Sequence, residues 1–219
     1  MIPKHIPLIE FILLCIAFPS LIIALKLGPF MLIFLWSAFA YCYLTHKKIF
    51  NSNFKEIWDW SQVKSEHLKP ILIRWALSCA IMVAFVYFYT PEHLFEIIKQ
   101  RPYALPFIAI FYSILSALPQ EFIFCTFFFD RYDGIFKSNR AKIIASALVF
   151  AYAHMLYINW IAPTFSLAAG LIFAQTYIKH RSLALVTIEH ALYGNAMFII
   201  GLGSYFFSCL LYTSPSPRD

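Results

Sequence analysis

Long apolar runs separated by short polar and basic segments dominate this 219-residue chain. Seven runs come near the roughly 20 residues that a helix needs to cross a bilayer, although some are short. The pattern predicts an all-α protein, a polytopic bundle of about seven transmembrane helices. The predicted spans are Leu8–Leu25, Phe30–Thr45, Pro70–Tyr89, Ala104–Phe129, Ile143–Ile158, Thr164–Ile178 and Ser182–Phe207.

The composition supports a membrane protein. Hydrophobic residues make up 61% of the chain and charged residues 13%, whereas a soluble domain carries about a quarter charged residues. The first apolar run is too long for a secretory signal and lacks a small-residue cleavage site, so we expect it to be retained as a helix. No cysteine belongs to a CxxC pair, and we expect buried free thiols. The cysteines are Cys15, Cys42, Cys79, Cys125 and Cys209.

The basic residues predict an orientation. The net charge is +6, but these residues lie between apolar runs, so they fit a role in membrane orientation rather than nucleic-acid binding. With the N-terminus inside, strict alternation places 12 basic residues inside and 4 outside. We therefore expect an integral protein of the lipid bilayer, in a bacterial inner membrane, with a cytoplasmic N-terminus. Phe50–Lys69, with Trp58 and Trp60, predicts an amphipathic helix on the inner surface.

The chain divides into three predicted parts. Residues 1–103 hold the N-terminal transmembrane helices and the cytoplasmic amphipathic segment, residues 104–208 form a core, and residues 209–219 form a polar tail. The tail, "CLLYTSPSPRD", resembles translated sequencing-adaptor read-through, in which case the native C-terminus is missing. A genuine polar tail is the other interpretation.

Ionisable side chains inside the apolar runs are the candidate chemistry. Each costs about 2.5–3.5 kcal/mol near the bilayer centre, so it usually faces a protein interior. At 1.5 Å rise per residue, Glu121 and His190 lie roughly 14 Å from the inner boundary, His154 roughly 18 Å and Asn195 roughly 21 Å. Three helices thus bring polar groups to similar depth, which predicts one shared site. Glu10 lies near a helix end and is expected to reach the interface.

Glu121 has the features of a general base. Pro119 is expected to kink or restart the helix, which would place Glu121 in a first turn where free N–H groups favour its anion, while burial opposes ionisation. A carboxylate held between these effects suits proton abstraction. Glu189 lies about 100° from His190 on the helix and is expected to orient an imidazole. Alternatively, these residues only form hydrogen bonds that stabilise the bundle.

Three short motifs occur on successive apolar runs: "QEFIFC" (Gln120–Cys125), "FAYAH" (Phe150–His154) and "HALYGN" (His190–Asn195). Together they resemble the CPBP family of membrane proteases, which includes type II CAAX prenyl proteases and bacteriocin-processing or immunity proteins. The family pattern is EExxxR, then FxxxH, then His followed by Asn. The resemblance covers about Ala104 to Phe207.

The resemblance implies an intramembrane endopeptidase of the glutamic type, historically classed as a metalloprotease, that needs no cofactor. Its substrate would be a membrane-associated peptide or protein, cleaved at a CAAX-type end or at a leader or sorting tail. It also implies that Glu121 and His154 activate water, and that His190 and Asn195 hold the oxyanion. The expected supporting residues are Gln120, Cys125, Phe150 and Glu189.

The chain departs from the family pattern at three positions. Gln120 stands in place of the first glutamate, and Cys125 in place of the arginine, so the helper cation is absent. Asn195 follows His190 by five residues instead of four, which rotates it away unless Gly194 permits a local bulge.

Three other functions stay open. A catalytically inactive family member could act as an immunity or scaffold protein. A zinc protease could use Glu121, His154 and His190 as ligands, although the chain has no HExxH motif. A small proton-coupled transporter could use buried Glu and His, but that class predicts paired repeats, and the chain shows none.

Overall fold

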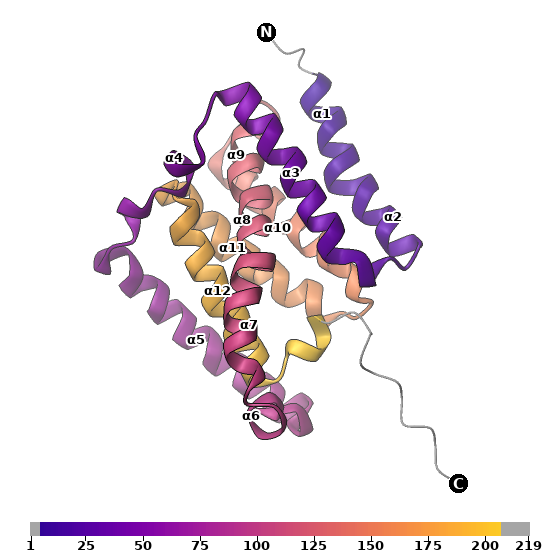
Figure 1. Ribbon diagram of the computed structural model, residues 1–219, viewed down its shortest axis with the longest axis vertical. Coiled ribbons are helices and arrows are strands. Elements are labelled where there is room, and N and C mark those ends of the chain that lie inside the picture. The colour runs from indigo at the N-terminus through magenta and orange to yellow at the C-terminus, as the bar shows by residue number, and fades with distance from the viewer. Residues whose placement is uncertain (1–4, 207–219) are drawn as a thin grey trace.

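The computed structural model describes residues 5–206, which form helices joined by short turns and contain no strand (Figure 1). The prediction of an all-α bundle is confirmed. The predictions for the tail and for Cys209 lie outside the described residues.

The first two spans form one side of the bundle (Figure 1). Phe18 and Phe34 join them by an edge-to-face contact at 5.7 Å. Only 11% of the first span and 6% of the second are buried. Their remaining apolar surface is available to lipid. The first span consists of α1 (His5–Phe11), the π-helical segment Ile12–Ala17 and α2 (Phe18–Ala24), and the second contains α3 (Met31–Phe50).

The segment after α3 forms two short helices instead of the single amphipathic helix expected. The chain breaks at Asp59, which has a left-handed backbone with φ 36°. The Ser182 hydroxyl donates to the carbonyl oxygens of Asp59 at 2.8 Å and Trp58 at 3.2 Å, and so holds the break against the start of α12. The elements here are α4 (Phe54–Trp58), the 3-10 helix Trp60–Gln62 and α5 (Ser65–Tyr89).

A continuous helix over Ala104–Arg131 runs through the middle of the bundle (Figure 1). It follows the short α6 (Glu96–Gln100) and alternates between α-helical and π-helical geometry. Its parts are α7 (Ala104–Tyr112), the π-helical Ser113–Ala117, α8 (Leu118–Glu121), the π-helical Phe122–Phe127 and α9 (Phe128–Arg131).

Three helices complete the described chain, and α12 is the most enclosed. Of its span, 67% is buried, more than in any other candidate span of the described residues. It packs against α5, α11 and the α7–α9 helix. The elements are α10 (Asn139–Ala153), a 3-10 helix His154–Tyr157, α11 (Ile161–His180), α12 (Leu183–Ile200) and a 3-10 helix Gly203–Phe206.

Six helices of the described residues are long and apolar enough to cross a membrane, so six of the seven predicted spans are found. The predicted span Ile143–Ile158 is different. It corresponds to α10, a helix of 15 residues, which rises only about 22 Å against a hydrocarbon core of about 30 Å. Ile158, with φ 55°, ends the 3-10 turn that follows it.

Basic and acidic side chains meet at one end of the bundle. Arg131 donates to Glu10 at 2.8 Å, so Glu10 has a buried partner, and its position relative to the membrane interface stays a prediction. His46 lies 2.8 Å from Asp130, and Arg181 pairs with the same carboxylate. The segments expected to face inside therefore gather at one end, and the orientation of that end in the membrane stays a prediction.

The Glu10–Arg131 pair generates a stability prediction. The two side chains are 10% and 6% exposed, and breaking a buried pair costs about 3 kcal/mol because one charge is left without a partner. We expect Arg131→Met to lower the free energy of unfolding by about that amount. The measurement is unfolding of the purified protein in mixed micelles.

The control is the double variant Glu10→Met with Arg131→Met. Because it removes both charges, it should be more stable than Arg131→Met alone. Equal stability of the two variants would show that the pair is not effectively buried.

Candidate active site

A cavity of about 460 Å³ lies between the helices and is lined by four of the eight candidate residues. Both imidazoles, His154 and His190, line it together with Gln120 and Phe150. Its remaining wall is largely apolar, from α3, α5, α7, α11 and α12. An apolar pocket with a few convergent polar groups is the usual form of a small binding or reaction site.

Glu121 contacts His190 instead of facing the cavity. Its Oε1 lies 2.6 Å from His190 Nδ1, and the Cys125 thiol donates to Oε2 at 3.1 Å. The carboxylate is 1% exposed and is not among the residues lining the cavity. In this geometry Glu121 meets the cavity through His190, and the expectation that Glu121 and His154 activate one water stays a prediction.

His190 is fixed on three sides. Its Nδ1 bonds to Glu121, and its Nε2 lies 2.9 Å from the Tyr112 hydroxyl. The Phe173 ring stacks on the imidazole with centroids 4.7 Å apart. A carboxylate on one nitrogen of an imidazole sets which ring nitrogen carries the proton and stabilises the charged form.

A π-helical segment makes this arrangement possible. At about 100° per residue, the nine positions between Tyr112 and Glu121 would place them on opposite faces of a regular α-helix. The π-helical turn Ser113–Ala117 lies between them and changes this phase. Both side chains consequently contact His190. Single π-turns inside helices are frequent at functional sites.

Pro119 is accommodated without ending the helix. The backbone keeps right-handed helical torsion angles at Ala117 and Phe122, so the helix continues past Pro119 and Glu121 is not in a free first turn as expected. A proline leaves the carbonyl four residues earlier without its helical donor. Here that carbonyl belongs to Leu115, and it accepts a hydrogen bond from the Trp36 indole at 3.0 Å.

His154 enters the cavity from the end of α10. Its Nδ1 lies 2.7 Å from the Phe150 carbonyl oxygen. A carbonyl can only accept, so Nδ1 carries the proton and Nε2 of the neutral ring keeps its lone pair. The Phe150 ring contacts both imidazoles, with centroids 4.5 Å from His154 and 5.8 Å from His190. Gly170 lets α11 approach closely there, since a Cβ would lie 3.2 Å from that ring.

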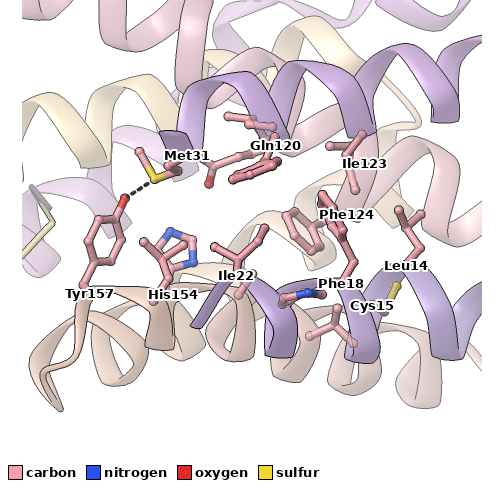
Figure 2. A pocket seen from close by; sticks show the side chains of 17 residues that line it. Leu14, Cys15, Phe18, Ile22, Met31, Gln120, Ile123, Phe124, His154 and Tyr157 are labelled. Atoms are coloured by element: carbon pink, nitrogen blue, oxygen red, sulfur yellow. Dashed lines mark hydrogen bonds between the residues drawn. The ribbon is translucent and has the colours of Figure 1, made fainter. Parts of the chain in front are cut away.

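A smaller apolar pocket of about 110 Å³ lies on the side of the first helix, and His154 and Tyr157 line it as well as the larger cavity. Figure 2 shows His154 and Tyr157 at one end of it and Leu14 and Cys15 at the other. Gln120 lines both cavities, and its amide nitrogen donates to Ser116 at 2.7 Å. Its buried Oε1 has no hydrogen-bond partner among the described residues.

Two predicted residues lie elsewhere. Asn195 donates to the Ala191 carbonyl oxygen at 2.8 Å and is not among the cavity residues, because α12 runs as a regular α-helix without a bulge. Glu189 accepts from Arg74 at 2.8 Å and does not orient an imidazole. The position four residues after His190 is Gly194, which does line the cavity.

Two residues with clear roles were missed by sequence reasoning. Tyr112 was missed because regular helical spacing separates it from Glu121; Pro119 was the available signal of irregular geometry. Arg74 lies within the predicted span Pro70–Tyr89 and has no predicted partner. A cation in a span needs a counter-charge, and Glu189 was the available carboxylate.

Within the described residues, no group of three His, Cys, Asp or Glu side chains has a geometry that could hold a metal ion. The three side chains considered as zinc ligands are bonded otherwise. Glu121 and His190 bond to each other, and His154 to a backbone carbonyl.

The Trp36–Leu115 hydrogen bond can be tested by a mutant cycle. We expect Trp36→Phe to lower the free energy of unfolding by about 1–2 kcal/mol beyond the loss that the smaller ring causes, because a buried carbonyl loses its donor. In a Pro119→Ala background the restored backbone N–H should remove that extra cost. The measurement is unfolding in mixed micelles; equal costs in both backgrounds would contradict this account of Pro119.

Comparison with known proteins gave one family match. Residues 102–197 match the family model described as type II CAAX prenyl endopeptidase Rce1-like. No curated protein and no solved structure matched. The matched segment contains Glu121, His154 and His190 and the helices that carry them. The resemblance seen in the motifs is thus confirmed for residues 102–197, and the chain is an integral membrane protein in which this segment is similar to the Rce1-like type II CAAX prenyl endopeptidases.

Proposed function

We propose that this protein is an intramembrane endopeptidase that hydrolyses a peptide bond by imidazole-activated water. One observation carries the proposal: two imidazoles from different helices line one cavity, and a buried carboxylate backs one of them. A purely structural pair would not need a cavity between the helices. A hydrolase needs space for water and for a peptide carbonyl.

His154 is the proposed base. Its Nε2 lone pair is available because Nδ1 holds the proton. In the first step Nε2 takes a proton from water while the water oxygen bonds to the peptide carbonyl carbon. In the second step the C–N bond breaks, and the imidazolium returns the proton to the leaving nitrogen. A positioned base of this kind contributes about 10²–10⁴ in rate.

The Glu121–His190 pair is the proposed electrostatic half of the site. The carboxylate lies 2.6 Å from Nδ1 of His190, a residue that is 4% exposed, and compensates the positive charge of that ring when it carries a second proton. Positive charge fixed beside the cavity favours the oxyanion that develops on the carbonyl oxygen. Glu121 thus acts as a positioning residue through His190. This assigns the carboxylate a different role from direct activation of water.

The proposed substrate is a peptide or protein segment in the membrane. The smaller apolar pocket ends at His154 and Gln120, so it fits an apolar group of the substrate next to the cleaved bond. The family name suggests a prenylated CAAX peptide; a leader or sorting tail is the alternative. We propose that the basic end of the bundle faces the cytoplasm of a bacterial cell.

The test is cleavage of a membrane-tethered peptide library, with prenylated and unprenylated members, by purified protein in detergent. We expect His154→Ala to lower kcat by about 10²–10⁴ and Glu121→Gln by about 10²–10³. Chelator should leave the wild type unchanged. Loss of activity with chelator, restored by zinc, would contradict the metal-free mechanism.

Glu189→Gln is the matched control for Glu121→Gln. Both carboxylates are buried, at 0% and 1% exposed, but Glu189 pairs with Arg74 away from the cavity. The control should lose stability and keep kcat. Equal loss of kcat in both variants would show a general effect of removing a buried charge.

One observation favours a second candidate, an inactive immunity or scaffold protein. Cys125 contacts Glu121 where the family has an arginine, and Glu121 does not line the cavity. No cleavage of any library member by folded wild-type protein would support that candidate. Activity gained by Cys125→Arg would then identify the missing cation as the cause.

A further inference from the structure

We propose that the Tyr112 hydroxyl donates the hydrogen bond to the oxyanion, taking the place of the family's asparagine. This inference rests on the proposed hydrolase function. It addresses a gap in the site: Asn195, the only asparagine of that motif, is directed to the Ala191 carbonyl and away from the cavity wall.

Gly194 is the first argument. It occupies the position four residues after His190, where the family pattern has asparagine. A Cβ built at Gly194 would overlap the Tyr112 ring and its hydroxyl. The ring therefore fills the space that a side chain at this position would take. The absence of a side chain at Gly194 and the presence of Tyr112 are parts of the same packing.

The second argument is the direction of the hydrogen bonds. When His190 carries a proton on both ring nitrogens, Nδ1–H donates to Glu121, 2.6 Å away, and Nε2–H donates to the Tyr112 oxygen, 2.9 Å away. The Tyr112 proton is then not used by His190. The Phe198 ring packs edge-on against Tyr112 at 5.4 Å, and Tyr112 lines the cavity. The hydroxyl can thus donate to an oxygen there, at the end of a hydrogen-bond chain that connects it through His190 to Glu121.

Two other side chains at the cavity direct a donor elsewhere. The Gln120 amide nitrogen donates to Ser116 at 2.7 Å. The proton on His154 Nδ1 is directed to the Phe150 carbonyl. Tyr112 is therefore the hydroxyl best placed to stabilise a charge beside His190, and its pairing with a charged imidazole strengthens it as a donor.

The test begins with Tyr112→Phe, which keeps the ring against Gly194 and removes only the hydroxyl. We expect kcat to fall about 10²–10³-fold with little change in KM, the loss seen when one oxyanion donor is removed. Tyr177→Phe is the control, since Tyr177 is a buried tyrosine on α11 that does not line the cavity; it should keep wild-type kcat.

A rescue variant separates chemistry from packing. Gly194→Asn alone should lose activity because its Cβ overlaps Tyr112. Combined with Tyr112→Ala it restores the family's spacing of four and removes the overlap. We expect the double variant to recover at least about tenfold in kcat over either single variant, as one restored donor permits. A double variant no better than the singles would count against the exchange.

Binding gives a readout besides turnover. A substrate peptide whose cleaved bond is replaced by a tetrahedral phosphinate should bind Tyr112→Phe about 10²-fold more weakly than it binds wild type. The affinity for the product peptide, which lacks the tetrahedral centre, should be the same for both proteins. Wild-type cleavage together with unchanged kcat and phosphinate affinity in Tyr112→Phe would overturn this inference alone. Wild type that neither cleaves nor binds the phosphinate would overturn the proposed function itself.

Discussion

The hydrogen bond between Glu121 and His190 is the interaction on which the site depends. A carboxylate inside a membrane-spanning helix is costly, and the usual solution is a partner in the protein interior. Here the partner is an imidazole 2.6 Å away on the most buried helix of the described bundle. The pair fixes the orientation of the His190 ring. It also explains why an acidic residue lies within so apolar a sequence.

Much of the surrounding structure serves to bring these two side chains together. The π-helical turn before Glu121 sets its direction relative to Tyr112. Pro119 follows that turn, and the Trp36 indole satisfies the carbonyl that proline leaves free. Gly194 admits the Tyr112 ring against α12. Each of these features is local, and together they align groups from three helices.

The sequence alone predicted the helical class, most spans and the meeting of buried polar side chains from different helices, because a missing charge partner in lipid is a strong physical signal. It failed where helical phase decides the result. Along α12 the regular spacing of 100° per residue holds, so Asn195 lies off the cavity. Along the α7–α9 helix the π-helical segment breaks that spacing, so regular geometry does not predict the contact of Tyr112 with His190. The length of α10 was also overestimated, since an apolar stretch continues beyond the helix end at Ala153.

The central claim, that Glu121 acts only through His190, is tested most directly by a double-mutant cycle on kcat/KM with Glu121→Gln, His190→Gln and the double variant. If the two residues act as a unit, the double variant should lose about as much as the more damaging single variant, as coupled catalytic residues do. Losses that multiply in the double variant would contradict the account, because Glu121 would then contribute to catalysis independently of His190.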